Sequence, residues 1–468
     1  MAQPEIAALQ RALSHATEYL ERLDDSPVAP TIDLAELRRR LSRPLADAGL
    51  PATDVIDALA ADVRGGLNNS ASARFFAWVI GGSTPAALAA DWLTATWDQN
   101  AAIYSCSPAA AVVEEVVGVW TKQLLGLPAT ASFALTTGCQ MAHVTALLAA
   151  RHSLLAARGW DVEERGLSGA PAIRVLTSTE AHGTIERALR MIGVGKGAIV
   201  SLPVGADGRL QPATLAEALA AKKDVPTIVV LLAGDLNLGA FDDFGALIPL
   251  AHQHGAWVHL DGAFGLWAAA SPKRRALLDG AAAADSWATD AHKWLNVPYD
   301  SGLAFVARPK DHHDAMSHRA SYMTDGGGAR EEVDWNPEWS RRARGFPIYA
   351  AIRELGRDGV AALVDRCCDH ARALVDGMGR LPGVEVLCRP TLNQGLVRFV
   401  DRTAGATEAD HARRTEEVIA RLLRDGTAYF GPVTWQGRRA MRISVCNWRT
   451  SAKDVERTVA AVARCLAG

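Results

Sequence analysis

The spacing of apolar and polar residues divides this chain into a helical start and a long middle in which strands alternate with helices. Apolar residues recur at helical spacing from 4 to 23, and a proline-containing link leads to a second helix near 34–41. Helical patterns continue from 91 to 127. Short apolar runs then predict strands at 132–135, 173–177, 227–233, 257–260, 286–289 and 302–307. This alternation predicts an α/β fold with a mostly parallel sheet covered on both faces.

The end of the chain repeats this pattern on a smaller scale. A helix begins around Phe346, and strands are predicted at 384–387, 395–400 and 441–445. A chain of 468 residues is long enough for two or three folding units. We expect an N-terminal helical arm at 1–95, a large α/β domain at 96–345 and a small α/β domain at 346–468. An arm helix that packs poorly on its own chain finds its partner face on a second subunit, so the arm predicts a dimer.

Composition narrows the class of partner. The formal net charge is only -3, from 49 basic and 52 acidic residues, which argues against binding to nucleic acid or a membrane surface and favours a small molecule. The seven cysteines show no metal-type repeat, so we expect reduced thiols and no metal site. The N-terminus lacks a signal-peptide pattern, and no apolar run reaches about 18 residues. We therefore expect a cytoplasmic protein.

Two residues at predicted strand ends suggest a specific chemistry. Asp261 follows the apolar run Trp257–Leu260, and Lys293 lies thirty-two positions later in the segment Ala288–Asn296. Pyridoxal phosphate needs an amine that holds its aldehyde as a Schiff base and a carboxylate that keeps its pyridine nitrogen protonated. Taken alone, Asp261 could cap a turn and Lys293 could be a surface residue. A partly desolvated lysine would have a lowered pKa and react as the neutral amine.

Further candidates follow other predicted strands. The turn containing Gly138, Cys139 and Gln140 precedes a helix, whose free amides and dipole suit a phosphate group, although many such turns look alike. His182 lies in a polar loop after 173–177 and could stack on the cofactor ring or simply be solvated. Because ligands of parallel sheets bind at the carboxyl ends of strands, these residues are expected to meet.

With these residues in place, the chain resembles the group II pyridoxal-phosphate-dependent amino-acid decarboxylases, which include the aromatic-L-amino-acid and glutamate decarboxylases. The most specific matches are His259-Leu260-Asp261 and His292-Lys293-Trp294. Collinear support comes from Arg74–Trp78, Ser107–Ala109, Ser340–Arg344 and Asn447–Thr450. The resemblance covers nearly the whole length. It implies the aspartate aminotransferase-like fold type I, pyridoxal 5'-phosphate as cofactor, and a homodimer with composite active sites.

The resemblance also implies roles for individual residues. Lys293 would carry the cofactor, Asp261 would pair with the ring nitrogen, and His182 would stack on the ring. The remaining expected cofactor contacts are Ala263, Gly138, Cys139, Gln140, Asp235, Ser286 and His292. Trp78 and Tyr104 would line the substrate pocket, while Arg442 could pair with a substrate carboxylate or with a structural acid. Tyr322 is the candidate proton donor.

The chain also departs from the family pattern. Cys139–His143 replaces the usual phosphate-turn residues, and Asp290 stands where asparagine often donates to the phosphate. Asp290 would repel a phosphate if its side chain pointed the same way. The expected mobile loop at 324–339 contains Gly326–Gly328, which suits a lid, but no tyrosine. Relatives that lose this proton donor can turn to oxidative deamination.

The expected reaction is α-decarboxylation of an L-amino acid to the amine and carbon dioxide. Transamination, aldol-type cleavage and oxidative decarboxylation-deamination use the same electron sink and remain alternatives. A non-catalytic homologue is a third reading, supported only by the altered phosphate turn. Trp78 and Tyr104 favour an aromatic or apolar substrate, although aromatic residues at these places are equally typical of core packing.

Overall fold

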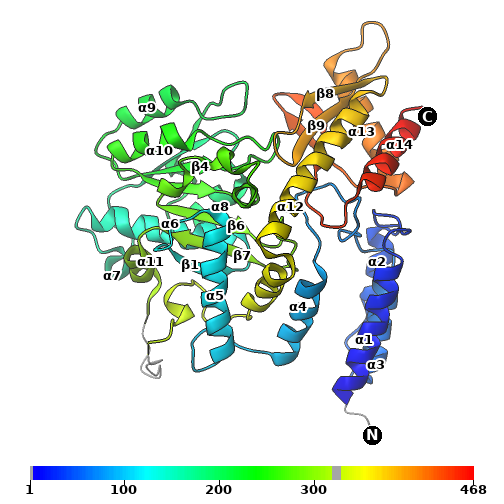
Figure 1. Ribbon diagram of the computed structural model, residues 1–468, viewed down its shortest axis with the longest axis horizontal. Coiled ribbons are helices and arrows are strands. Elements are labelled where there is room, and N and C mark those ends of the chain that lie inside the picture. Colours follow the sequence, from blue (N-terminus) through cyan, green and yellow to red (C-terminus); the bar gives the residue numbers. More distant parts are fainter. Residues whose placement is uncertain (1–3, 319–327, 468) are drawn as a thin grey trace.

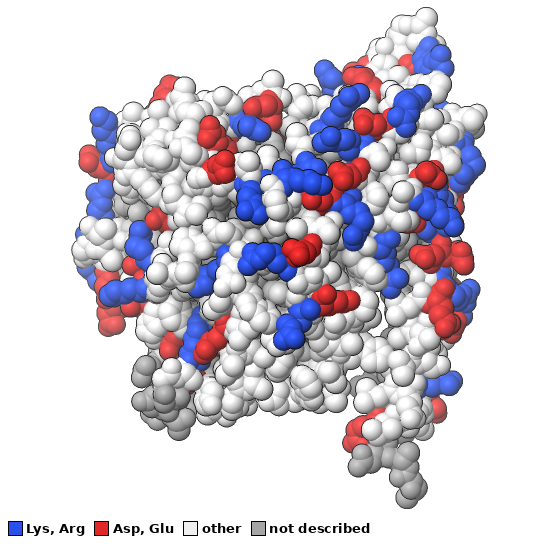
Figure 2. All heavy atoms as spheres, viewed as in Figure 1, with Lys and Arg blue, Asp and Glu red and all other residues white. Residues whose placement is uncertain are grey.

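The computed structural model describes residues 4–318 and 328–467. The expected proton donor Tyr322 and most of the glycine run at 326–328 lie outside the described residues. Within the described part of the chain, no helix is long and apolar enough to cross a membrane. Figure 2 shows basic and acidic side chains intermixed over one face, which agrees with the small net charge.

The chain begins with three helices that form an arm beside the rest of the molecule (Figure 1). They are α1 (Pro4–Glu21), α2 (Leu34–Leu41) and α3 (Ala52–Val63), of which α3 was not predicted from sequence. None of these helices has a buried residue, and α1 leaves Ile6, Leu9 and Leu13 exposed. The arm therefore has an apolar face that its own chain does not cover.

Two further helices lead into the main body. Helix α4 (Pro85–Trp97) begins with a proline, and α5 (Pro108–Leu125) is capped by the Ser107 side chain, which accepts from the Ala110 amide. The expected domain boundary at residue 95 falls inside α4. Exposed apolar residues of α4 and α5 include Trp97, Val112 and Val119. The lower centre of Figure 2, over α5, carries few charged side chains.

A seven-stranded sheet forms the centre of the large domain, in the order β1-β7-β6-β5-β4-β2-β3. The strands are β1 (Ser132–Thr136), β2 (Arg174–Ser178), β3 (Ile199–Leu202), β4 (Thr227–Leu232), β5 (Trp257–Asp261), β6 (Ser286–Asp290) and β7 (Gly302–Val306). Of these strands, only β3 was not predicted from the sequence, because two of its four residues are exposed and it is not a buried apolar run. The sheet is mostly parallel, but β7 runs antiparallel to both of its neighbours.

Helices cover both faces of this sheet, which explains why the strands other than β3 are buried throughout. Alternate residues of β4 enter different cores: Ile228 and Val230 pack with α6 and α8, whereas Val229 and Leu231 pack with α5 and α10. The helices of this domain are α6 (Cys139–Ala156), α7 (Val162–Arg165), α8 (Gly183–Met191), α9 (Pro212–Ala220), α10 (Phe244–Gln253) and α11 (Pro309–Met316). Short 3-10 turns lie at Lys196–Ala198, Gly265–Ala270, Arg275–Leu278, Ala281–Ala283 and Glu332–Asp334.

Helix α12 (Gly345–Gly379) joins the two α/β parts and bends at Gly356, whose φ is 61°. Its first half packs against α4 and α5, and its second half packs against the C-terminal elements. Just before α12, the guanidinium of Arg341 forms a fully buried ion pair with Glu114 of α5 and donates to the carbonyls of Ala101 and Leu135. This contact ties the segment before α12 to the large domain.

The C-terminal part contains a four-stranded antiparallel sheet in the order β10-β11-β9-β8. Its strands are β8 (Val384–Cys388), β9 (Gln394–Phe399), β10 (Gly431–Trp435) and β11 (Arg438–Ser444), and β10 was not predicted. Helix α13 (Glu408–Asp425) packs on this sheet, and helix α14 (Ala452–Ala467) packs against α13 and α12. A capping box between Thr407 and Asp410 starts α13.

The direction of the strands brings several loop residues to one edge of the large sheet. Strands β2, β4, β5 and β6 are parallel, so Asp261 and Asp290 end neighbouring strands at the same edge. Because β7 is reversed, its first residue, Gly302, lies there opposite both Thr136 and Asp290. The turn at Gly138 also begins at this edge, which is where ligands of such sheets bind.

Candidate active site

A cavity of about 350 Å³ opens at this edge of the sheet. Loops after β1, β2, β4 and β6 supply Gly138, His182, Asp235 and Lys293, and the last residue of β5 supplies Asp261. The sequence-predicted residues Trp78, Cys139, Gln140, Ala263, His292 and Arg442 also line it. The structure thus brings together residues separated by more than 300 positions of sequence.

Lys293 is the amine of this cavity. Its Nζ atom lies 3.0 Å from Oδ2 of Asp290. Burial lowers the pKa of Lys293, but the negative charges of Asp290 and Asp261 outweigh burial and raise this pKa above its ordinary value. The lowered lysine pKa expected from the sequence is therefore wrong, because that expectation counted desolvation and left out the neighbouring carboxylate of Asp290.

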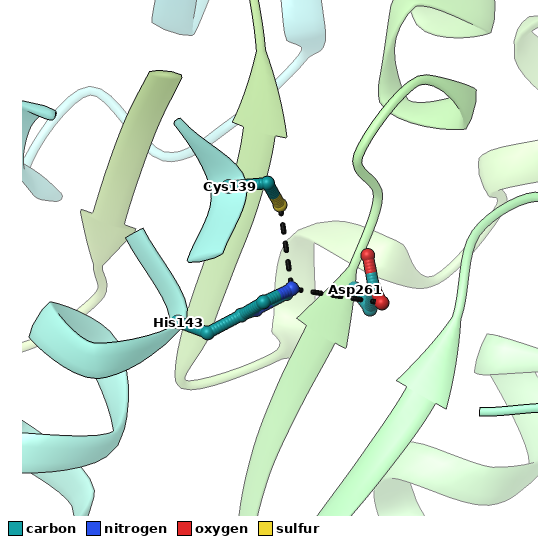
Figure 3. A group of neighbouring side chains, drawn as sticks. All are labelled: Cys139, His143 and Asp261. Carbon is teal, nitrogen blue, oxygen red and sulfur yellow. Dashed lines mark hydrogen bonds and ion pairs between the residues drawn. The ribbon is translucent and has the colours of Figure 1, made fainter. Parts of the chain in front are cut away.

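Asp261 lies at the end of β5, with His143 and Cys139 of α6 beside it (Figure 3). Its Oδ2 atom is 3.6 Å from Nε2 of His143, which is in turn 3.3 Å from Sγ of Cys139. Its Oδ1 atom accepts from the Ala263 amide at 3.2 Å. The three buried ligand-type atoms lie within 4.8 Å of one another, a spacing that a metal ion could use. The same carboxylate is the one that a pyridinium nitrogen requires.

A chain of buried hydrogen bonds supports Asp261 from behind. Nδ1 of His143 is 2.9 Å from Nε2 of His259, and Nδ1 of His259 is 2.8 Å from Oγ of Ser286. The Trp257 indole donates to the same hydroxyl at 2.9 Å. Because an indole N–H can only donate, every donor is satisfied when Ser286 donates to His259, His259 to His143, and His143 toward Asp261.

Both histidines of this chain are uncharged at neutral pH. Burial lowers the pKa of His143 to about 3 and that of His259 to about 3. A neutral imidazole with one N–H can donate to Asp261 without cancelling its charge. The carboxylate therefore stays available for a cationic ring nitrogen.

The turn before α6 carries features of an anion-binding seat. Gly138 caps α6, and an added Cβ there would come within 3.2 Å of the His292 ring. Both amide atoms of the Gln140 side chain are buried without a hydrogen-bond partner among the described residues, as is the Ser301 hydroxyl. The Cys139 amide donates to Oδ1 of Asp290 at 2.6 Å, so Asp290 does point into this turn.

His182 and His292 are held in defined orientations. Nδ1 of His182 accepts from the Thr184 amide, which caps α8 and leaves the N–H on Nε2. Burial lowers the pKa of His182, so the ring is a neutral donor. Nδ1 of His292 accepts from the Ser301 amide at 3.2 Å, and the ring stacks on Tyr299 at 4.3 Å between centroids.

Arg442 of β11 and Asp235, which follows β4, both line the cavity. Arg442 is 7% exposed, and its guanidinium makes no hydrogen bond or ion pair with the residues that the structure describes. Asp235 accepts from the amides of Asn237, Leu238 and Ala240 and so shapes its own turn. Arg442 is therefore the cation of the cavity that has room for an anionic ligand.

Trp78 stands at the edge of the cavity in a strained backbone. Its φ is 54° and that of Val79 is 59°, values that a β-branched residue rarely adopts. The Trp78 ring is half exposed and contacts the rings of Phe75 and Tyr429. The backbone strain places an aromatic side chain beside the cavity.

Two predicted site residues lie elsewhere. Ser286 does not line the cavity, because it begins β6 whereas the cavity lies at the strand's end; its hydroxyl reaches Asp261 only through His259 and His143. Tyr104 is also absent from the cavity wall, and its amide donates to Glu331. Sequence reasoning missed the role of His143 and His259. The spacing of His259 and Asp261 on one strand put both on one face and could have signalled it.

The donor set fits pyridoxal 5'-phosphate. The Asp261 carboxylate, beside the neutral N–H of His143, suits the ring nitrogen, and the Lys293 amine suits the aldehyde. The unpaired donors at Gln140 and Ser301 suit the phosphate. Fold and site together define a pyridoxal-phosphate-dependent enzyme of fold type I.

Comparison with known proteins gives the family. Residues 35–401 match the pyridoxal-dependent decarboxylase conserved domain, and the chain belongs to this family. It is 29% identical to tryptophan decarboxylase 1 of Oryza sativa subsp. japonica over 93% of this chain and 88% of that protein. It is 30% identical to L-2,4-diaminobutyrate decarboxylase of Rhizobium meliloti (strain 1021), over 80% of this chain and 74% of the relative.

A solved structure gives the same fold. The Oryza sativa TDC structure with PLP and tryptamine has a TM-score of 0.93 at 24% identity, covering 100% of this chain and 98% of that one. The family membership confirms the expected cofactor and the expected class of reaction, decarboxylation of an amino acid.

Proposed function

We propose that this enzyme decarboxylates an L-amino acid with an aromatic or large apolar side chain. The observation that carries this substrate class is the aromatic ring of Trp78 at the cavity edge, packed on the rings of Phe75 and Tyr429, with Phe264 in the wall. An aromatic side chain can stack there with favourable dispersion and little entropy loss. The similar proteins named tryptophan decarboxylase and aromatic-L-amino-acid decarboxylase support the same class.

Each cavity residue has a proposed part in the reaction. The cofactor, when bound, supplies an electron sink for the charge left by departing carbon dioxide. Lys293 would hold the cofactor by its Nζ atom, and the Asp261 carboxylate would pair with the ring nitrogen. The cationic Arg442 binds the substrate carboxylate or another anionic group of the substrate.

The proton that replaces carbon dioxide needs a donor at the substrate carbon. His182 lines the cavity, and we propose that its ring takes up a proton from solvent and gives it to the substrate carbon from Nε2, returning to the neutral form. Tyr322, which lies outside the described residues, is the second candidate. Comparing the solvent-deuterium content of the amine from His182→Gln and Tyr322→Phe variants would distinguish them.

We also propose a homodimer with composite sites. The uncovered apolar face of the arm and the weakly charged surface over α5 support it, because exposed apolar surface of this extent marks an interface. Tyr104 does not line the cavity of its own chain, and we propose that it reaches the active site of the partner subunit. We further propose that the chain is divided into an arm, a large domain and a small domain. We also propose a reducing cytoplasmic location, which the seven free thiols support.

The test is a product assay on an amino-acid panel. We expect carbon dioxide and amine in equal amounts, with highest kcat/KM for aromatic substrates. Aldehyde, ammonia and peroxide would instead identify oxidative deamination, and a keto acid without gas would identify transamination. Borohydride reduction and peptide mapping should place the cofactor on Lys293; the Lys293→Ala variant is the control.

A further inference from the structure

The turn that precedes α6 already contains an anion that belongs to the protein. The Asp290 carboxylate is 2% exposed, and its Oδ1 atom accepts the Cys139 amide at 2.6 Å. The same oxygen is 3.5 Å from Nε2 of His292, and it would lie 3.5 Å from a Cβ added at Gly138. Asp290 therefore sits against the glycine, the helix amide and the imidazole that a cofactor phosphate would use.

The other carboxylate oxygen of Asp290 has a different function. Oδ2 lies 3.0 Å from Nζ of Lys293, the amine of the cavity. The carboxylate thus bridges the helix N-terminus and the lysine. It is held by main-chain register as well, because Asp290 ends β6 opposite Gly302 and its own amide donates to the Ala263 carbonyl.

We infer that Asp290 is a built-in competitor for the cofactor phosphate, so that this enzyme binds pyridoxal 5'-phosphate with an unusually small contribution from the phosphate group. The inference rests on the proposed cofactor site. A carboxylate can only accept hydrogen bonds, whereas an asparagine at this place could donate to a phosphate oxygen. A phosphate seated here has to take over the Cys139 amide and lie beside a like charge.

The arrangement leaves few other donors to compensate. The Gln140 side chain and the Ser301 hydroxyl are the buried side-chain groups near this turn that lack a hydrogen-bond partner among the described residues. Neither carries a positive charge. The consequence is an enzyme whose cofactor exchanges readily and whose occupancy follows the cofactor supply.

The test uses two ligands that differ only in the phosphate and form no bond with Lys293: pyridoxamine 5'-phosphate and pyridoxamine. Dissociation constants are measured by calorimetry for the wild type, Asp290→Asn and Asp290→Ser. The ratio of the pyridoxamine constant to the phosphorylated one isolates the phosphate contribution. We expect this ratio to rise about tenfold or more in both variants, because one negative charge next to the phosphate is removed.

Two controls make the outcome specific. Asp261→Asn should weaken both ligands by a similar factor and leave the ratio unchanged, since Asp261 lies at the opposite, ring-nitrogen end. Inorganic phosphate should compete with pyridoxamine 5'-phosphate more strongly in Asp290→Asn than in the wild type. A ratio that stays constant or falls in both Asp290 variants overturns the inference while leaving the cofactor site intact. Failure of the wild type to bind either ligand would refute the cofactor site itself.

Discussion

Replacing His143 by leucine tests the hydrogen-bonded chain behind Asp261. The change leaves the His259 N–H without its acceptor and removes the imidazole that faces Asp261. An unsatisfied buried donor costs about 1–3 kcal/mol, so at about pH 7.5 the variant should be less stable by that amount. Cofactor affinity should fall about fivefold, as expected for the loss of a polar N–H that faces the Asp261 carboxylate.

The pH dependence gives a sharper magnitude. Burial lowers the pKa of His143 from its ordinary value of 6.5 to about 3 in the folded chain. The unfolded chain therefore binds a proton near pH 6.5 that the folded chain refuses until about pH 3. The stability that this neutral histidine contributes is complete above pH 6.5 and is lost as the pH falls from 6.5 to about 3. At about pH 5, some 1.5 units below the unfolded pKa, the loss is about 2 kcal/mol.

The stability gap between wild type and His143→Leu should accordingly narrow by about 2 kcal/mol between about pH 7.5 and pH 5. Urea unfolding at one fixed protein concentration measures this difference in the free energy of unfolding. His312→Leu is the matched control: burial lowers its pKa to about 3 as well, but it bonds Ser132 and the Trp335 carbonyl away from the cavity. It should show the same narrowing without the loss of cofactor affinity. A gap that is independent of pH in both variants refutes the reasoning.

Three further predictions concern the cavity and its supports. Arg442→Gln should raise KM about tenfold with a smaller change in kcat, measured by steady-state kinetics, because a charged hydrogen bond to the substrate is lost. Gly302→Ala should destabilise the protein by about 1–3 kcal/mol and weaken cofactor binding, since its Cβ would collide with the Gly138 backbone; Gly183→Ala, where a Cβ meets nothing within 4 Å, should be tolerated. Arg341→Met should cost about 3–5 kcal/mol in thermal or urea unfolding because it strands the buried Glu114 carboxyl, and a loss below about 1 kcal/mol would contradict this assignment.

Buried strands and strand-end motifs were predictable from sequence because they leave strong local signals. The run that became β4 is almost wholly apolar, and the shorter runs that became β5 and β6 end in Asp261 and Asp290, which mark the cavity edge. The elements that were missed, β3, β10 and α3, carry mixed or exposed residues. Their formation depends on neighbours in space, which a local pattern does not contain.

The errors at the site have one physical origin. A lysine pKa depends on charges a few ångströms away, and only the fold shows that Asp290 turns toward Lys293. Ser286 sits in the same polar segment as Asp290, yet the two occupy opposite ends of one strand. The position of a residue in a strand predicts the face of the sheet on which its side chain lies. Its distance from the cavity along the strand depends on how all the strands of the sheet are aligned.

The reversed strand β7 has a consequence for how the enzyme keeps its nucleophile in place. Antiparallel neighbours can be joined by a short loop, whereas parallel ones need a crossover helix. Lys293 therefore lies in the loop that joins β6 to β7, and these two strands pair through five residue pairs. Because both ends of this loop are fixed by the sheet, we expect the Lys293 backbone to keep its position when the surrounding helices move. The enzyme should then bind its cofactor without a prior rearrangement of this loop.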